Sequence, residues 1–208
     1  MLVIIQARSN SKRLKNKILK LIFGKPMIWH VIQRIKKAKK VKKIIVATSS
    51  NKTDDKLVEY LIKNNFNYYR GSLNNVAERM NKASNKAKHF LRISGDSPLI
   101  DSRIIDKAIS IYQKKRNYDL ITNIFPRTYP KGQSVEIIKS SILKKSIKFM
   151  NKYELEHVTK YFYKNNKKFK IKNFKSLKLK NKIQLSVDNI KDLNFLKTKY
   201  KKKFLETI

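Results

Sequence analysis

Short runs of branched apolar residues recur along the chain with the length and composition of buried strands. The runs are nearly continuous rather than alternating, which is expected of strands covered on both faces. They occupy residues 2–6, 43–47, 89–93, 119–122 and 184–187. We therefore predict a sheet that lies between two layers of helices.

Helical periodicity fills the intervals between these runs. Apolar residues recur at three- and four-residue spacing in the segments 27–37, 54–63, 76–85 and 103–114. Asp54 and Ser102 stand where helix N-caps are expected. The alternation of strands and helices predicts an α/β fold with a mostly parallel sheet, helices on both faces and right-handed crossovers. Ligands of such sheets bind outside the carboxyl ends of the strands.

The second half of the chain has a less regular pattern. A loop at 125–132 contains two prolines and a glycine, a composition that suits a substrate-facing loop and an ordinary surface turn equally well. The other predicted elements are strands at 134–139 and 169–174 and helices at 140–149, 154–163 and 188–200. A length of 208 residues is enough for one sizeable core, so we expect residues 1–208 to form a single domain.

The cysteine content and the hydropathy of the chain indicate in which cellular compartment the protein is expected. The chain has no cysteine, which excludes disulfides, thiolate metal sites and a covalent cysteine mechanism, and makes a reducing cytoplasm the expected location. The N-terminal apolar run is too short for a signal peptide, and no run approaches the roughly 20 apolar residues of a membrane span. We expect a soluble, unprocessed protein.

The balance of charges is unusual. The counts of 51 Lys and Arg and 14 Asp and Glu give a formal net charge of +37, which by itself suggests a nucleic acid or an anionic membrane as partner. The lysines are spread in short groups along the whole chain, without a basic arm or an aromatic platform. Lys, Asn and Ile are abundant and have A/T-rich codons, which favours compositional drift over a functional basic surface. We expect no specific nucleic-acid partner.

The loop after the first predicted strand carries the strongest chemical signal. Small residues such as Ser11 separate its five cations, which are Arg8, Lys12, Arg13, Lys15 and Lys17. At the carboxyl end of a strand, such a loop can surround a triphosphate with backbone and cationic donors. It is not a P-loop, because the glycines and the Gly-Lys-Ser/Thr ending are absent. The alternative is that any loop of so basic a chain contains lysines.

Two carboxylates follow predicted strands. Asp96 comes after the strand at 89–93 through Ser94-Gly95, and Asp188 follows the run at 184–187. Mg²⁺ takes one or two carboxylates together with substrate phosphates. Two strand-end carboxylates in a chain with only 14 acidic residues favour a metal site. The alternatives are a turn role for Asp96 and a helix cap for Asp188.

The order of several motifs resembles one enzyme family. The string IIQARSNSKRLKNKILK is followed by GKPM, IIVATSSNKTDD, GSLNNVAERM, LRISGDSPLID, NIFPRTYPKGQSVEI, ELEHVTKYF and LSVDNIKDL. In this order they resemble the cytidylyltransferases related to CMP-sialic acid and CMP-KDO synthetases, and among these the spore-coat polysaccharide biosynthesis branch. Each motif alone is weak, but the combination is specific and covers nearly the whole chain.

The resemblance implies a fold and a reaction. The fold is that of the nucleotide-diphospho-sugar transferases, a Rossmann-like α/β sandwich. The reaction is attack by an oxygen of a sugar or sugar acid on the α-phosphate of CTP, with release of pyrophosphate and with Mg²⁺ as cofactor. The resemblance places the metal on Asp96 and Asp188.

The resemblance also assigns individual residues. The nucleotide-binding candidates are Gln6, Ala7, Arg8, Ser11, Arg13, Lys17 and Arg92. The catalytic candidates are Arg13, Lys17 and Asp96. The candidates for binding the acceptor sugar are Arg127, Tyr129, Glu136 and His157, although His157 suits a partly buried helix position equally well. The region 125–175 is expected to face the acceptor and to contribute to a homodimer.

Two departures from the family pattern leave the nucleotide and the acceptor open. Lys15-Asn16 replaces the usual Pro-Gly, and Asn74-Asn75 replaces an acidic pair. The leading hypothesis is transfer of CMP to a sugar acid for surface polysaccharide biosynthesis. The alternatives are the same fold with another nucleoside triphosphate or a nucleotide-sugar, and a basic nucleic-acid-binding protein.

Overall fold

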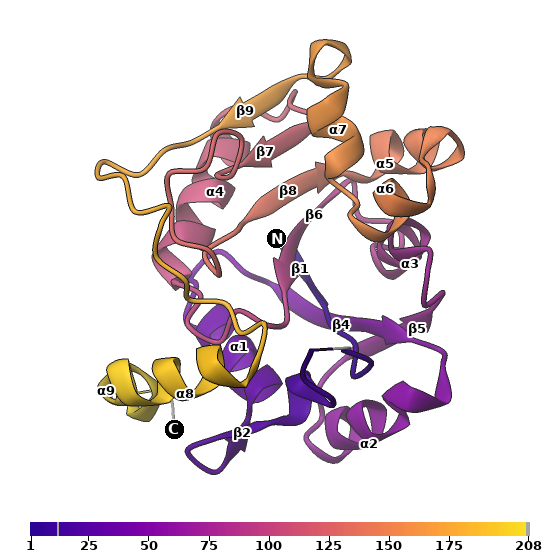
Figure 1. Cartoon of the computed structure of the whole chain (residues 1–208). Coiled ribbons are helices and arrows are strands. Elements are labelled where there is room, and N and C mark those ends of the chain that lie inside the picture. The colour runs from indigo at the N-terminus through magenta and orange to yellow at the C-terminus, as the bar shows by residue number, and fades with distance from the viewer. Residues whose placement is uncertain (12, 207–208) are drawn as a thin grey trace.

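A seven-stranded sheet runs through the molecule, as the computed structural model of residues 1–11 and 13–206 shows (Figure 1). In spatial order its strands are β5 (Tyr68–Gly71), β4 (Lys43–Ser49), β1 (Leu2–Gln6), β6 (His89–Ser94), β8 (Glu136–Lys139), β7 (Leu120–Thr122) and β9 (Ile171–Asn173). Only β8 runs antiparallel to its neighbours, and the other pairings are parallel. The prediction of an α/β fold with a mostly parallel sheet is confirmed.

Helices fill the connections between the strands. They are α1 (Met27–Lys36), α2 (Asp55–Lys63), α3 (Val76–Ala83), α4 (Ser102–Lys114), α5 (Ser140–Ser146), α6 (Lys152–Glu156), α7 (Lys160–Lys164), α8 (Ile190–Lys199) and α9 (Lys201–Leu205). A small hairpin of β2 (Leu21–Ile22) and β3 (Lys25–Pro26) precedes α1. Single 3₁₀ turns are η1 (Lys17–Leu19), η2 (Lys52–Asp54), η3 (Ile147–Phe149) and η4 (Asn166–Lys168). No helix in the described part of the chain is long and apolar enough to cross a membrane.

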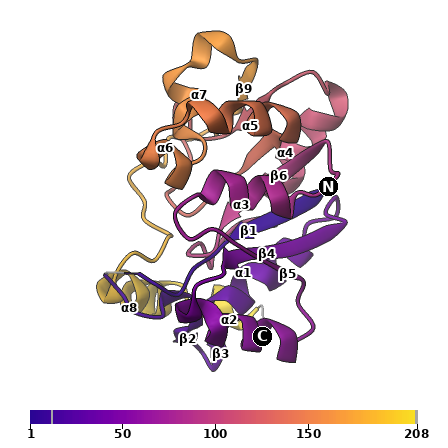
Figure 2. The same ribbon diagram turned by 90° about the vertical axis from the view of Figure 1, so that its right-hand side faces the viewer.

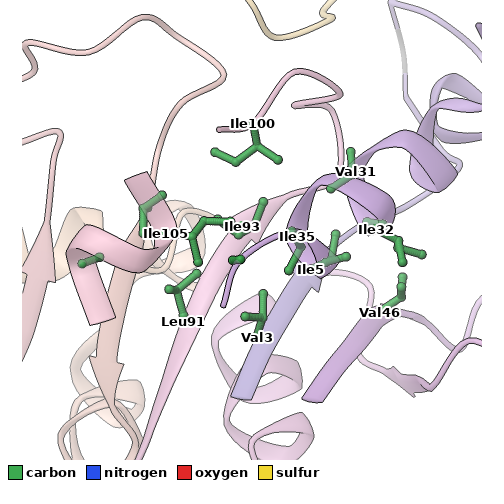
Figure 3. Packing of buried hydrophobic residues seen from close by; sticks show 14 of the residues in the cluster. Val3, Ile5, Val31, Ile32, Ile35, Val46, Leu91, Ile93, Ile100 and Ile105 are labelled. Atoms are coloured by element: carbon green, nitrogen blue, oxygen red, sulfur yellow. The ribbon is translucent and has the colours of Figure 1, made fainter. Parts of the chain in front are cut away.

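The sheet is buried on both faces because successive residues of a strand point to opposite sides. Val3 and Ile5 of β1 belong to a cluster with α1, α2 and α4 (Figure 3), whereas Ile4 packs in a second cluster with α3, α5 and α7. Figure 2 shows α3, α5, α6 and α7 gathered on this second side. Each such fully buried aliphatic side chain contributes roughly 1.5–3 kcal/mol. The central strands are therefore a rigid base for the loops that follow them.

A third cluster joins the C-terminal helices to the start of the chain. Val187 packs with Met27 of α1 and with Leu196 and Phe204 of α8 and α9. Asn189 caps α8 in a capping box with Asp192. Asp188 is therefore not the cap of this helix, and its carboxylate is available for other contacts.

Several predicted bounds were wrong. Residues 184–187 form no strand: the segment is extended and makes one bridge, between Lys131 and Gln184. The predicted helix at 154–163 is two short helices, α6 and α7, with His157 between them. Asp101 rather than Ser102 caps α4, and the Asp54 carboxylate does not cap α2. The half-exposed edge strand β5 has too little apolar character to be predicted.

Candidate active site

The carboxyl ends of β1 and β6 lie side by side, and polar side chains connect them. Gln6, at the end of β1, accepts hydrogen bonds through Oε1 from Nε and Nη2 of Arg92, at 2.9 and 2.7 Å. Arg92 pairs in turn with the buried carboxylate of Glu136 on β8. Tyr163 donates from its hydroxyl to Oε1 of Glu136 at 2.5 Å. These bonds fix the side chain of Gln6 in one orientation.

The chain after β1 is anchored by a buried acid, Asp54, that the sequence pattern predicted only as a helix cap. Asp54 is fully buried and accepts hydrogen bonds from the backbone N–H of Ser9 at 2.5 Å and of Ser49 at 3.0 Å, and from the Ser49 hydroxyl. Burial raises the pKa of Asp54, but the hydrogen bonds lower it by more than burial raises it. The net pKa therefore lies below the ordinary value. Asp54 thus holds the start of the loop against the end of β4.

Lys17 lies at the centre of the predicted catalytic group. Its Nζ is 2.9 Å from Oδ2 of Asp96 and 3.9 Å from Oδ1 of Asp188, and it donates to the carbonyl of Val187 at 2.7 Å. The Lys17 side chain is only 11% exposed. Residues far apart in the sequence therefore meet at one ammonium group. The backbone adds a further tie, because the N–H of Val187 donates to the carbonyl of Asp96 at 2.9 Å.

Two arginines of the loop extend this charged group towards solvent. Arg13 donates from Nη2 to Oδ1 of Asp188 at 3.0 Å, and its side chain is largely exposed. Arg8 pairs with Glu156 at 2.6 Å, and both side chains are partly exposed. Lys12 lies outside the described residues. Arg8 and Arg13 are thus held by carboxylates from remote segments while keeping access to solvent.

A pocket of about 520 Å³ opens beside Asp96. Its lining includes Arg92, Arg127 and His157, together with Tyr163 and Ser186. Arg127 is fixed by a hydrogen bond from Nη2 to the Ser134 hydroxyl at 3.0 Å. The pocket therefore combines the carboxylate of Asp96 with the side chains of Arg92, Arg127 and His157.

Burial shifts the pKa values of several pocket residues. It lowers the pKa of Arg127 and of His157 below their usual values, and nearby Arg92 and Lys160 lower that of His157 further. His157 is therefore neutral at neutral pH and offers one hydrogen-bond donor and one acceptor. Burial and then the charge of Glu136 raise the pKa of Tyr163 well above its usual value, so its hydroxyl keeps its proton.

The remaining predicted residues lie at different distances from this pocket. Ala7 lies directly at the end of β1, where its Cβ approaches Gly95, and the backbone N–H of Ser11 is bonded to the carbonyl of Ser9. Glu136 is buried, with Arg92 and Tyr163 as partners. Tyr129 lies apart: its hydroxyl contacts the carbonyl of Lys175, and its ring lines a different cavity. The structure thus brings Arg127 and His157 together, but not Tyr129.

Another residue that sequence analysis missed is Arg79 of α3. It is 1% exposed, and only its Nη1 donates, to the carbonyl of Ser72 at 2.7 Å; Nε and Nη2 have no partner among the described residues. Burial lowers its pKa to about 10, although the charge of Asp54 opposes the shift. Its position within an ordinary helical pattern gave no signal. Its charge lies close enough to interact with those of Asp54 and Arg8.

The donor set of Asp96 and Asp188 fits a hard divalent cation. Both are carboxylates, the ligand type that Mg²⁺ prefers, and both already lie within 4.0 Å of one cationic group, Lys17. No group of three or more His, Cys, Asp or Glu side chains in the described residues could hold a metal. The fit is therefore that of an ion completed by phosphate oxygens rather than of a closed protein cage.

Comparison with known proteins identifies the family. The family model described as cytidylyltransferase matches residues 2–206. An uncharacterised protein of Methanocaldococcus jannaschii is 38% identical over 158 residues, which cover 74% of this chain and 63% of that protein. The spore coat polysaccharide biosynthesis protein SpsF of Bacillus subtilis is 30% identical over 149 residues, 68% of this chain and 60% of SpsF. The match thus spans less than two thirds of the length of these relatives.

The solved structures that resemble this chain support the same family assignment. A cytidylyltransferase from Leptospira borgpetersenii superposes with a TM-score of 0.89 at 32% identity, covering 95% of this chain and 85% of that one. A CMP-2-keto-3-deoxy-manno-octonic acid synthetase complexed with CTP superposes with a TM-score of 0.75 at 17% identity, covering 97% and 99% of the two chains, a likeness of fold. The chain therefore belongs to the cytidylyltransferase family.

Proposed function

We propose that this protein transfers CMP from CTP to a sugar acid and releases pyrophosphate, as the activation step of surface polysaccharide biosynthesis. The observation that carries the proposal is Lys17, held between Asp96 and Asp188 at the carboxyl ends of β1 and β6. The relatives named for spore-coat polysaccharide biosynthesis and for 3-deoxy-manno-octulosonate cytidylyl transfer support the substrate class.

In the proposed reaction an oxygen of the sugar acid forms a bond to the α-phosphorus of CTP. The bond between that phosphorus and the oxygen bridging to the β-phosphate breaks, its electron pair leaves with pyrophosphate, and the hydroxyl proton of the acceptor passes to water. Arg13 and Lys17 hold the β- and γ-phosphates, while Gln6, Ala7 and Arg8 border the base and ribose, with Ser11 and Arg92 beside them. Arrangement and charge stabilisation are the main sources of rate in such transfers.

Asp96 and Asp188 would hold Mg²⁺ together with phosphate oxygens. When bound, the ion supplies neutralisation of phosphate charge and orientation of the α-phosphate. Arg127 would pair with the carboxylate of the sugar acid, and a neutral His157 would hydrogen-bond one of its hydroxyls. Glu136 would act on the acceptor side through Arg92, whereas Tyr129 lines a different cavity and is given no part in this step.

We further propose that the chain is one nucleotidyltransferase domain that works in the cytoplasm, where nucleoside triphosphates are available. The region 125–175 would form the acceptor side, because it supplies Arg127 and His157 to the pocket. The exposed side chains of Phe149 and Tyr153 in this region support a contact between two copies. Analytical ultracentrifugation of wild type and of Phe149→Ser tests the homodimer.

The direct test is pyrophosphate release in the presence of CTP, Mg²⁺ and a panel of sugar acids. Removing one metal carboxylate by Asp96→Asn should lower kcat about 100-fold or more, since several kcal/mol of charge stabilisation are lost. The matched control is Glu59→Gln, which makes the same carboxylate-to-amide change at an exposed position of α2. Unchanged turnover of Asp96→Asn would refute the mechanism.

Thermal shifts with CTP, UTP, GTP, ATP and dTTP separate this function from its alternatives. A ligand at about a hundred times its Kd stabilises the fold by roughly 2.7 kcal/mol, which is easily measured. A selective, Mg²⁺-dependent response to CTP is expected. Preference for another triphosphate would favour a related transferase. Such a preference is worth testing because Asn74-Asn75 replaces the acidic pair of the family pattern, and Asn75 caps α3.

A further inference from the structure

The loop that follows β9 exposes apolar side chains among lysines. This loop, residues 175–183, has the sequence KSLKLKNKI and carries four lysines and no acid. Leu177 is completely exposed and Leu179 is 69% exposed. Exposed apolar side chains that are rimmed by charged residues mark a surface that can bind a partner. In Figure 1 the loop projects at the left edge of the molecule, beyond β9.

The backbone of the loop is held in place. The N–H of Ser176 donates to Oγ1 of Thr128 at 2.8 Å, and the N–H of Lys180 to the carbonyl of Thr128 at 2.9 Å. The N–H of Lys131 donates to the carbonyl of Ile183 at 2.9 Å. The loop therefore presents its leucines from a fixed base, and little ordering is needed when a partner binds.

The charge around the loop decides what kind of partner fits. Residues 157–187 contain ten lysines and no Asp or Glu. Lys107 of α4 adds a further cation, 5.8 Å from the ring of Phe174. A contact between two copies through this loop would set its four lysines against the same four lysines, with no acid of the loop to pair with them. An anionic surface that also accepts leucine side chains has the complementary chemistry.

We propose that the loop 175–183 docks the protein on the surface of an anionic lipid bilayer. Leu177 and Leu179 enter the boundary between headgroups and acyl chains, and the lysines beside them contact the headgroups. Each lysine close to an anionic leaflet strengthens binding about fivefold, and each leucine buried there at least ~10-fold. Together they give reversible attachment, unlike a membrane span. This binding mode does not depend on the reaction proposed above.

Cosedimentation with vesicles tests the proposal, using phosphatidylcholine with and without phosphatidylglycerol at physiological salt. The wild-type protein should bind only the anionic vesicles. Leu177→Ser with Leu179→Ser should weaken this binding at least ~100-fold, ~10-fold for each leucine. The control, Leu21→Ser with Ile62→Ser, changes two side chains that are each 56% exposed elsewhere and should bind as wild type does.

The lysines are tested in parallel. Lys178→Gln with Lys180→Gln should weaken binding about 25-fold, whereas Lys167→Gln with Lys168→Gln, an equal loss of charge on η4, should weaken it far less.

Equal losses in both lysine pairs with no effect of the leucines would overturn the proposal in favour of generic attraction. No vesicle binding, with a change of oligomeric state in the leucine variant, would overturn it in favour of a contact between copies. Pyrophosphate release by the leucine variant without vesicles, expected at the wild-type rate, keeps this test separate from the proposed reaction.

Discussion

The ammonium group of Lys17 lies between the carboxylates of Asp96 and Asp188, and each of these charges is stabilised by the others. The cost of placing its ammonium at 11% exposure is offset by Asp96, Asp188 and the carbonyl of Val187. Removing the ammonium leaves two neighbouring carboxylates without their shared cation. The stability of this corner of the molecule should then depend on whatever cation replaces it.

Lys17→Gln is therefore expected to lower the stability by about 1–3 kcal/mol in EDTA, less than for a fully buried pair because both carboxylates are partly exposed. Added Mg²⁺, without nucleotide, should raise the Tm of Lys17→Gln more than that of the wild type. Lys56→Gln, at an exposed position of α2, should show no extra response. Equal Mg²⁺ shifts in wild type and Lys17→Gln would contradict the shared metal site.

Asp54 gives a second prediction for single residues. Its carboxylate accepts three hydrogen bonds while fully buried, and Asn in its place would turn an amide N–H group towards a backbone donor. Asp54→Asn should lower the stability at neutral pH by about 1–3 kcal/mol. Since the folded pKa lies below the ordinary value of 3.8, this stabilisation is present above that pH and is lost as the pH falls through the folded pKa.

Urea unfolding of wild type and Asp54→Asn across the acid range measures this difference. The two curves should begin to converge below about pH 4, where the unfolded-state carboxyl takes up its proton, and the advantage of the charged form should be gone once the pH is below the folded pKa. The exposed Glu59→Gln should follow the wild type throughout. A difference that persists unchanged at low pH would mean that shape, not charge, is what Asp54 contributes.

At the scale of elements, the bounds of a strand were predicted best where a continuous run of apolar residues marks the whole strand. The strand at 2–6 was predicted with its observed bounds, because continuous apolar residues need no knowledge of neighbours. The segment 184–187 has the same pattern, but Val187 is buried against Met27 of α1 and the helices α8 and α9, and among the described residues the segment makes a single bridge, to Lys131, in place of a strand pairing. The break between α6 and α7 was missed because apolar spacing continues across it, although the chain turns at His157.

The turn at Gly132 lies against the segment 184–187, and this contact gives a prediction about glycines. Its φ is +88°, and an added Cβ would lie 2.5 Å from the backbone of Leu185 and Ser186. Gly132→Ala should destabilise by at least ~2 kcal/mol, because strain and a backbone clash add. Gly24 also has a positive φ, +77°, but nothing lies within 4 Å of its added Cβ, so Gly24→Ala should cost only about 1 kcal/mol. Chemical denaturation of both variants decides; similar losses would mean that the backbone contact at Gly132 relaxes.

For the whole molecule, the residues of the candidate site were predicted from two sources, their positions after predicted strands and the resemblance to the family. Asp96, Lys17 and Arg8 were found from their positions next to the predicted sheet edge. The partners that fix them could not be found: Arg8 meets Glu156 across 148 residues, and Ser9 meets Asp54 across 45. Such contacts depend on tertiary packing and leave no local pattern in a sequence. Tyr129 shows the reverse case, a residue next to a predicted site loop whose side chain lines another cavity.

The net charge of +37 leads to the last prediction, which separates generic from specific binding. Because the lysines are spread over the whole surface, the protein should bind RNA without sequence preference. With about six phosphate contacts, that affinity should fall roughly 10³-fold between about 50 and 200 mM salt. The response to CTP and Mg²⁺ depends on a few short-range contacts, so it should persist at the higher salt. Fluorescence anisotropy with labelled RNA and thermal shifts with CTP, both for wild type and Asp96→Asn, measure the two together. Loss of only the CTP response in Asp96→Asn identifies a nucleotide site on a surface whose charge is unspecific, whereas RNA binding that resists salt and depends on Asp96 would favour a nucleic-acid-binding protein.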